Sequence, residues 1–236
     1  MSRLGISPEG IRARIFLLAV SIAATRFFPL RAMGFYSRVI VPLLCDFGLD
    51  RPFVAKYRRQ LLAHASGNTL EIGFGTGLNL LYYSAHVRKL TTVDPNVGMY
   101  RRAKRRIMQA GIDVDQRVLG SERLPFEDCT FDCVVSTFTL CSIEDVAQAL
   151  REVYRVLKAG GKFLFLEHGI SPHLNVQKWQ HRLNWLQMRL AGGCHLDRDM
   201  RALVTAQPFA SVKIDEFYIE RTPKTHGYMY RGIATK

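Results

Sequence analysis

The sequence predicts an α/β fold in which a mostly parallel sheet ends in an antiparallel pair of strands. Apolar, strand-like segments alternate with helical segments between residues 69 and 168. Two further strand-like segments follow at residues 211–220 and 226–236, and only residues 221–225 separate them. Because so short a connection cannot hold a crossover helix, these two strands are expected to be antiparallel. With 236 residues, 48% of them hydrophobic and 22% charged, the chain can form one large globular domain with a full core.

The individual strands and helices follow from the hydrophobic pattern. Seven strands are expected, at residues 69–73, 89–94, 113–119, 131–139, 162–168, 211–220 and 226–236. Helices are expected after the first, second and fourth strands, at residues 78–83, 98–110 and 143–157. Ser142 is expected to cap the last of these helices, with Asp145 in its first turn, and Gly160 and Gly161 are expected to end it.

The N-terminal part of the chain, residues 1–66, is expected to be helical and to precede a main domain at residues 67–236. An apolar run from Ile15 to Ala24 lies between arginines. The run is shorter than the roughly 20 apolar residues of a membrane-spanning helix, and the arginines after it do not suit a signal-peptide cleavage region. Two interpretations stay open. The helix packs on the main domain as a lid, or it lies in a membrane interface.

The net charge of +13 would suit nucleic acid, an anionic membrane surface or an acidic substrate. Part of it is concentrated in the expected helix at residues 98–110. The basic residues there are Arg101, Arg102, Lys104, Arg105 and Arg106. Their simplest interpretation is a solvated helix face.

The five cysteines are an odd number without framework spacing, which indicates reduced thiols in a cytoplasmic protein. Cys129 and Cys133 lack the paired spacing of a structural zinc site, so no metal is expected. Cys141 and Cys194 are interpreted as small, buried apolar residues.

The stretch "TLEIGFGTGLNL" places Gly73, Gly75 and Gly77 directly after the first strand, at the sheet edge where open α/β folds bind ligands. Asp94 ends the second strand, where a carboxylate can accept hydrogen bonds from both ribose hydroxyls. These features fit a dinucleotide as well as another adenosine cofactor. Three observations favour S-adenosylmethionine (SAM). Leu78 occupies the position of the third dinucleotide glycine, Glu71 can meet an amino-acid ammonium, and the last strands are antiparallel.

Several stretches carry a family resemblance, namely "LEIGFGTGLNL", "VDPN", "REVYRVLKAGGKFLFLEHG" and "GGCHLDRD". They resemble the ubiquinone/menaquinone-biosynthesis-like class I SAM-dependent methyltransferases. Within that family the chain is most similar to the branch related to the membrane-associated alkyl thiol methyltransferases. The resemblance runs from about Gly34 to the C-terminus. It implies a Rossmann-like, seven-stranded methyltransferase sheet with an antiparallel last strand, and SAM as the cofactor.

The resemblance also implies a set of cofactor contacts. Around the amino-acid end and the ribose these are Glu71, Gly73, Gly75, Gly77, Asn79, Asp94 and Thr137. Around the adenine they are Pro95, Asn96, Met99, Ser121 and Glu122. Related enzymes often have an acidic residue at the position of Gly120, bonded to the adenine amino group. Here that contact is missing or comes from Glu122.

Two histidines are candidate general bases, because an imidazole titrates near neutral pH. His168 ends the fifth strand and His195 lies in "GGCHLDRD". A histidine bonded to backbone is the alternative for each. Trp179, Trp185, Phe138 and Tyr36 are interpreted either as an apolar acceptor pocket or as ordinary core.

The predicted function is SAM-dependent methyl transfer to a small apolar acceptor, with a thiol or a similar soft nucleophile favoured. Methylation of a lipid, quinone or amine at a membrane surface is the alternative, and a non-catalytic SAM-binding protein is a further one. Nucleic acid is not favoured, because "STFT" follows the fourth strand in place of an Asp/Asn-Pro-Pro-aromatic motif. The expected location is the cytoplasm, with peripheral membrane association left open.

Overall fold

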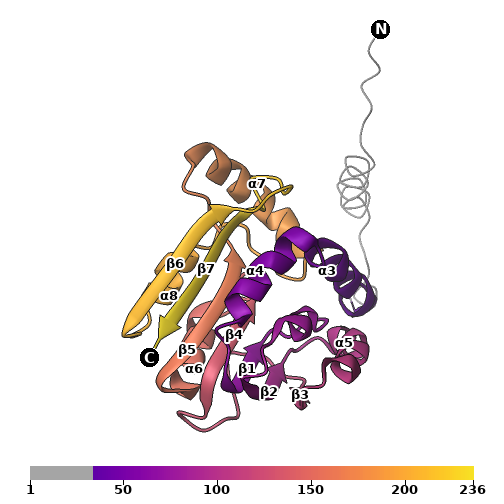
Figure 1. Cartoon of the computed structure of the whole chain (residues 1–236). Helices are drawn as coiled ribbons and strands as arrows, with labels where there is room; N and C mark the ends of the chain where they lie inside the picture. The colour runs from indigo at the N-terminus through magenta and orange to yellow at the C-terminus, as the bar shows by residue number, and fades with distance from the viewer. Residues whose placement is uncertain (1–33) are drawn as a thin grey trace.

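The computed structural model describes residues 34–236, and in this part of the chain one seven-stranded sheet forms the centre of the fold (Figure 1). The strand order is β3-β2-β1-β4-β5-β7-β6. The strands are β1 (Gly67–Ile72), β2 (Val87–Val93), β3 (Val114–Arg117), β4 (Phe131–Thr137), β5 (Leu157–His168), β6 (Ser211–Tyr218) and β7 (Tyr228–Thr235). Each expected strand is present.

Only β7 runs against the other strands. β1 pairs in parallel with β2 and β4, and β4 pairs in parallel with β5. β7 is inserted between β5 and β6 and is antiparallel to both. This confirms the predicted Rossmann-like sheet with an antiparallel last strand.

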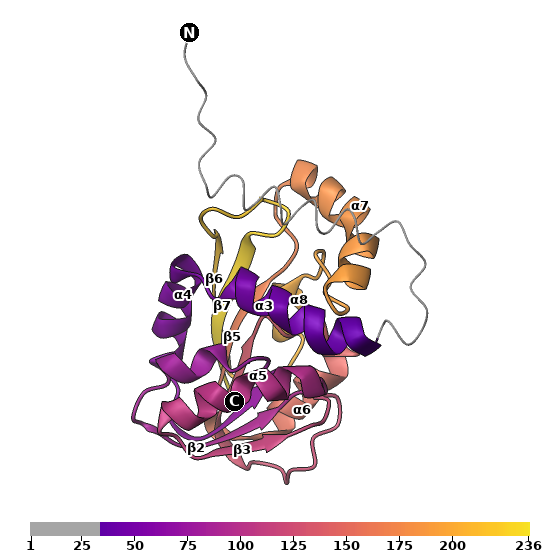
Figure 2. The same cartoon turned by 90° about the vertical axis from the view of Figure 1, so that its right-hand side faces the viewer.

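The central strands are apolar on both faces because helices cover both faces. The helical elements are η1 (Tyr36–Ile40), α3 (Val41–Leu49), α4 (Pro52–Leu62), η2 (Leu78–Tyr82), α5 (Val97–Ala110), α6 (Val146–Val156), α7 (Leu174–Leu190) and α8 (Met200–Thr205). Buried side chains of α4, η2 and α5 pack with Val135 and Leu164 on one face of the sheet. Buried side chains of α6 and α8 pack with Val134 and Phe163 on the other. α3 lies across the carboxyl ends of the strands, as Figure 2 shows.

Two details of the expected helix after β4 are wrong. Asp145, not Ser142, is the N-cap, and its Oδ1 accepts a hydrogen bond of 2.9 Å from the backbone N–H of Gln148. The helix ends at Val156, because Leu157 is extended with φ −72° and ψ 137° and begins β5. Gly160 and Gly161 therefore lie within β5, where the register with β4 shifts.

The apolar segment from Ile15 to Ala24 lies outside the described residues. Within residues 34–66 the chain is helical in η1, α3 and α4, as expected for the N-terminal part. Among the described helices, none is long and apolar enough to cross a membrane.

Candidate active site

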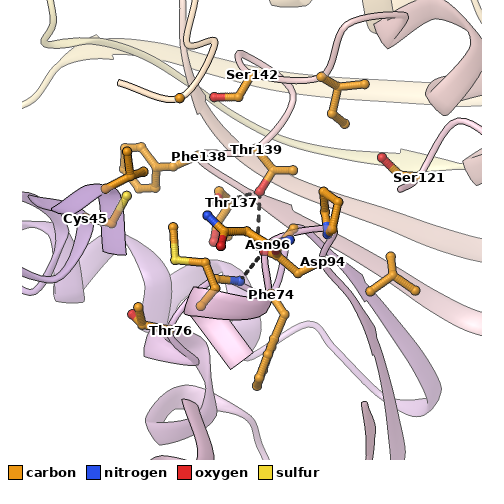
Figure 3. Close-up of a pocket in the computed structure, with 18 of the residues that line it drawn as sticks. Cys45, Phe74, Thr76, Asp94, Asn96, Ser121, Thr137, Phe138, Thr139 and Ser142 are labelled. Atoms are coloured by element: carbon orange, nitrogen blue, oxygen red, sulfur yellow. Dashed lines mark hydrogen bonds between the residues drawn. The ribbon is translucent and has the colours of Figure 1, made fainter. Parts of the chain in front are cut away.

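A cavity of about 460 Å³ lies at the carboxyl ends of β1, β2 and β4, and its volume is in the range of small-molecule sites (Figure 3). Its lining residues come from η1, α3, α4, the loops after β1, β2, β3 and β4, and the turn after α7. All predicted cofactor contacts except Gly77 line it. These are Glu71, Gly73, Gly75, Asn79, Asp94, Pro95, Asn96, Met99, Ser121, Glu122 and Thr137.

The three glycines of the loop after β1 serve different purposes, although φ is positive at each of them. A Cβ on Gly73 would lie 2.1 Å from Oγ1 and Cγ2 of Thr139, so this glycine permits close packing. A Cβ on Gly75 would meet only the carbonyl oxygen of Gly73, at 3.9 Å, so its bare backbone faces the cavity. Gly77 has φ +78° and is the N-cap of η2, outside the cavity lining.

Alanine substitutions are expected to separate these purposes. Gly73→Ala should strongly lower the free energy of unfolding, because Thr139 cannot move away without breaking its hydrogen bond to the Gly73 carbonyl oxygen. Gly75→Ala should cost only the roughly 1–2 kcal/mol of a left-handed residue, but should weaken SAM binding. Gly111→Ala is the control for backbone strain, because φ there is +64° and nothing lies within 4 Å of the added Cβ. Urea unfolding and calorimetric SAM titration of the three variants measure both effects. Equal loss of stability in all three would contradict the Thr139 contact.

Asp94 joins the glycine loop to the end of β2. Its Oδ2 accepts the N–H of Gly75 at 2.8 Å, and its Oδ1 accepts the N–H of Asn96 at 2.8 Å. Burial raises the pKa of Asp94, and the two backbone N–H groups act in the opposite direction. Each carboxylate oxygen accepts one of these hydrogen bonds and so retains capacity for another, and Asp94 lines the cavity.

A buried polar network forms the floor of the cavity beside Glu71. Nη1 of Arg58 donates to Oδ1 of Asn79 and, at 2.9 Å, to Oγ1 of Thr137. Nδ2 of Asn79 donates to Oε1 of Glu71 at 2.8 Å, and the hydroxyl of Tyr83 donates to Oε2 at 2.6 Å. Burial lowers the pKa of Arg58 to about 10 and raises the pKa of Glu71 to about 7.

This network fits the amino-acid end of SAM. Nε of Arg58 is buried and has no hydrogen-bond partner, although Arg58 lines the cavity. A guanidinium with a free donor suits a carboxylate, and Glu71 beside it suits an ammonium. An α-amino acid group would therefore satisfy the buried donor that the protein leaves unpaired.

Sequence reasoning missed Arg58. The signal was present, because Val54, Arg58, Leu61 and Leu62 are the buried residues of α4 and lie at helical spacing on one face. A charged residue on the apolar stripe of a helix marks a buried polar site.

SAM affinity is expected to rise with pH up to about 7, by at most about tenfold per pH unit, because Glu71 becomes charged over that interval. The free energy of unfolding is expected to change in the opposite direction and to fall as the pH rises. The folded pKa is raised, so the contribution of Glu71 to folding is complete below its ordinary pKa and is lost as the pH rises through about 7. Glu71→Gln should remove both slopes, whereas Glu144→Gln, at an exposed position, should keep them. Calorimetry and thermal unfolding across this pH range test the assignment. A Glu71→Gln variant with the wild-type binding slope would refute it.

Glu122 and Gly120 lie together on the side of the cavity where the adenine is expected. Gly120 has no side chain, and the carboxylate of Glu122 lies beside it. A Cβ on Gly120 would meet Oε2 of Glu122 at 2.8 Å, so the Glu122 carboxylate occupies the space beside Gly120. Both residues line the cavity, as does Met99. The carboxylate of Glu122 therefore lies where it could take the place of an acidic side chain at position 120, and its contact with adenine stays a prediction.

η1 and α3 cover the cavity and are held on α5. Asp46 of α3 forms ion pairs with Arg102 at 2.8 Å and Arg106 at 3.2 Å, and it accepts a hydrogen bond from the Thr76 hydroxyl. The backbone of Arg38 packs closely on Gly98. A Cβ added to Gly98 would lie 1.9 Å from the carbonyl oxygen of Arg38. Two of the five clustered basic residues therefore hold the cover. Arg101, Arg102, Lys104 and Arg105 are exposed, as a solvated helix face requires, whereas Arg106 is partly buried.

Neither candidate general base lines the cavity. His168 is buried, with Nε2 3.0 Å from Sγ of Cys194. His195 has Nδ1 3.4 Å from the Asn184 amide nitrogen and 3.9 Å from Oδ1 of Asp197. Among the described lining residues there is no histidine.

The predicted acceptor pocket is wrong in most of its members. Trp179 and Trp185 lie on the outer side of α7 and are 56% and 60% exposed. The Tyr36 hydroxyl donates to the carbonyl oxygen of Leu190 at 2.7 Å, outside the lining. Of these aromatic residues only Phe138 lines the cavity.

Comparisons with known proteins agree with this geometry. A family model described as a methyltransferase domain matches residues 70–165. Thiol S-methyltransferase TMT1B of Rattus norvegicus is 31% identical over 62% of this chain and 61% of its own length. The ubiquinone/menaquinone biosynthesis C-methyltransferase UbiE of Rubrivivax gelatinosus is 32% identical over 52% of this chain and 48% of its own. Phosphatidylethanolamine N-methyltransferase of Cereibacter sphaeroides is 29% identical over 73% of this chain and 83% of its own.

A solved structure shows the same fold. A SAM-dependent methyltransferase of Thermotoga maritima, described as a possible histamine N-methyltransferase, superposes with a TM-score of 0.62 at 19% identity. The superposition covers 85% of this chain and 98% of the other. The chain spans less than two thirds of the rat thiol methyltransferase and about half of UbiE. The sheet topology, the cavity and these similarities show that the chain belongs to the class I methyltransferases, whose methyl donor is S-adenosylmethionine.

Proposed function

We propose that the chain transfers the methyl group of SAM to a small apolar acceptor, a thiol in preference to other nucleophiles. SAM supplies an electrophilic methyl group on a sulfonium. Arg58 and Glu71 hold its amino-acid end, and Asp94 holds the ribose. Met99 and Glu122 flank the adenine.

The character of the remaining lining carries the acceptor proposal. Beyond the residues assigned to the cofactor, the wall includes the apolar side chains Val41, Leu49, Phe138, Ile143 and Ala191. No histidine lines the described cavity, and its carboxylates Glu71, Asp94 and Glu122 are assigned to the cofactor, so an acceptor that loses its proton without a dedicated base suits the site best. A thiol does so most readily, since its pKa is ~8.5 and its thiolate is a strong nucleophile. The similarity to thiol S-methyltransferases supports the same choice.

The step is an in-line displacement. The thiol loses its proton to solvent, and the thiolate sulfur attacks the methyl carbon. The bond from that carbon to the sulfonium breaks, and its electron pair stays on the departing sulfur. The products are a methyl thioether and S-adenosylhomocysteine. The contribution of the chain is alignment, which supplies on the order of 7–11 kcal/mol at best.

A panel of acceptors tests the proposal. Purified protein with labelled SAM is offered alkyl thiols, quinols, amines and phospholipid vesicles. We expect methyl thioether from apolar thiols, with kcat/KM rising with pH as the thiol ionises. The Asp94→Ala variant provides the background rate. A quinol, amine or lipid that turns over while every thiol fails would overturn the choice of a thiol. SAM binding without any turnover would indicate a non-catalytic SAM-binding protein.

A lipid or quinone acceptor at a membrane surface is the second candidate, and one observation favours it. On the exposed side of α7, the guanidinium of Arg182 lies 5.4 Å from the Trp179 ring centroid, and that of Arg189 lies 5.8 Å from the Trp185 ring centroid. Exposed tryptophans beside arginines suit an anionic membrane interface. The similarity to the phosphatidylethanolamine N-methyltransferase fits this candidate too.

We also propose that η1 and α3 act as a lid over bound SAM, in line with one interpretation of the N-terminal part. The Asp46 contacts to Arg102, Arg106 and Thr76 support this role, since they join α3 to the glycine loop and to α5. The general-base roles of His168 and His195 stay predictions, and a thiol acceptor requires neither of them.

A further inference from the structure

Two cysteines and a histidine converge one layer behind the cavity wall. Cys141 follows β4, His168 ends β5 and Cys194 follows α7. The two sulfur atoms lie 3.6 Å apart, and Nε2 of His168 lies 3.0 Å from Sγ of Cys194. All three ligand atoms lie within 4.8 Å of one another, and each side chain is buried.

The cluster is poorly satisfied as a set of hydrogen bonds. A thiol is a weak donor and a weak acceptor, and the hydrogen-bond partner of Nε2 of His168 is the sulfur of Cys194. Nδ1 of His168 is buried without any hydrogen-bond partner. A ligand at Nε2 would not pair Nδ1. Nε2 and the two sulfur atoms, which are joined only by weak hydrogen bonds to sulfur, are the atoms that suit a ligand with strong affinity for thiolate and imidazole.

Backbone hydrogen bonds fix the segments that carry the cluster. The N–H of His195 donates to the carbonyl oxygen of Cys141 at 2.8 Å. The N–H of Ile170 donates to the carbonyl oxygen of Arg198 at 2.9 Å, and the Arg198 guanidinium donates to the carbonyl oxygen of Leu140. The segment after α7 is therefore tied both to the loop after β4 and to the end of β5, and the three ligand atoms are held together before anything binds.

The spacing of the ligand atoms approaches that of a tetrahedral zinc site. With Zn–S bonds of about 2.3 Å and Zn–N bonds of about 2.0–2.1 Å, two sulfurs should lie about 3.8 Å apart and a sulfur and a nitrogen about 3.6 Å apart. The sulfur pair is already at 3.6 Å, and the His168 to Cys194 distance must open by about half an ångström. Two thiolates also balance the charge of a divalent ion, which suits a buried site.

We propose that Cys141, His168 and Cys194 bind one zinc ion and leave its fourth position open. Thiolate and imidazole ligands select zinc over the hard cations magnesium and calcium. Ser142 and Gly192 line the cavity, and they lie one residue after Cys141 and two residues before Cys194. The open position is thus separated from the acceptor space by the thickness of the cavity wall. Bound through Nε2, His168 has no lone pair for base catalysis, so this proposal replaces its predicted role.

The proposed thiol acceptor gives the ion a purpose. A thiol would reach the fourth position only where the wall at Ser142 and Gly192 moves aside, and it would lose its proton there because zinc-bound thiols are deprotonated. This purpose rests on the proposed function, whereas binding of the ion does not. The sequence pattern could not reveal the site, since its cysteines are 53 residues apart and follow no short paired spacing.

Metal analysis and cobalt substitution of the full chain test the site. We expect stoichiometric zinc in reduced, zinc-loaded protein, and a thiolate-to-cobalt charge-transfer band after exchange with Co²⁺. Cys141→Ser and Cys194→Ser should each lose the band and most of the zinc. Cys133→Ser is the matched control, since Cys133 is a buried cysteine outside the cluster. Circular dichroism and SAM titration show that each variant is folded.

The outcomes are decisive. Loaded protein without zinc, a cobalt spectrum without the thiolate band, or a Cys141→Ser variant with full zinc content would overturn the proposal. So would a Cys141–Cys194 disulfide that persists in the reduced, zinc-loaded protein. Zinc binding with no thiol turnover would overturn the proposed function and leave the site intact. Equal thiol turnover by zinc-free and zinc-loaded protein would overturn the role of the ion in deprotonating the thiol.

Discussion

Replacing Asp94 with Ala is expected to lower the affinity for SAM by about a hundredfold. The variant loses the carboxylate that accepts the N–H groups of Gly75 and Asn96 and that faces the cavity. Hydrogen bonds to a charged group contribute roughly 1.5–3 kcal/mol each, so the loss of two to the ribose corresponds to about 10²–10⁴-fold before compensation. Calorimetric titration with SAM measures the change.

Asp113→Ala is the control. Asp113 is an exposed acidic residue that follows α5 in the sequence, whereas Asp94 precedes it. The affinity of Asp113→Ala for SAM should equal that of the wild type. If Asp94→Ala also bound SAM as the wild type does, the ribose assignment would be wrong.

Arg58→Met is expected to lower the affinity for SAM by about ten- to a hundredfold while keeping an unbranched side chain in the buried position. The substitution removes the buried guanidinium that bonds Asn79 and Thr137 and whose Nε has no partner in the protein. The loss corresponds to one charge-assisted hydrogen bond or more at roughly 1.5–3 kcal/mol. Arg59→Met is the matched control, because the next residue of α4 is an exposed arginine.

A truncated ligand separates a binding role from a structural one. 5′-Methylthioadenosine has the adenosine but not the amino-acid group. We therefore expect Arg58→Met to leave its affinity unchanged and Asp94→Ala to lower it. Equal loss for SAM and methylthioadenosine in Arg58→Met would mean that Arg58 only supports the fold.

The parts of the site that the sequence predicts are the local ones. Gly73 and Gly75 follow a strand within a few residues, and Asp94 ends the next strand, so their places in a parallel sheet follow from the chain order alone. Arg58 and Asp46 reach the cavity through the packing of α4 and α3, which no pattern near β1 specifies. Local patterns also mislead where two nearby residues could both form the same helix N-cap.

Ser142 and Asp145 are both good N-caps, and only the tertiary position of the loop after β4 decides between them. Trp179 and Trp185 are interpreted from the sequence as part of an acceptor pocket or of the core, and both are exposed. In α7 the only buried residue is Gln180, whose amide donates to the carbonyl oxygens of Gly169 and Leu196. A polar side chain therefore anchors this helix, and the tryptophans remain at the surface.

The place of β7 between β5 and β6 sets the order in which a newly made chain can complete its sheet. β1 to β5 can pair as soon as they emerge from the ribosome, because each partner among them precedes β6. β6 has no partner until β7 arrives, and the outer edge of β5 stays open until then. That edge belongs to a strand with four consecutive fully buried apolar residues, Phe163 to Leu166. The nascent protein thus exposes the unpaired backbone N–H and C=O groups of the β5 edge until residues 228–235 have been translated. Aggregation through this edge competes with folding during the time between synthesis of β5 and synthesis of β7.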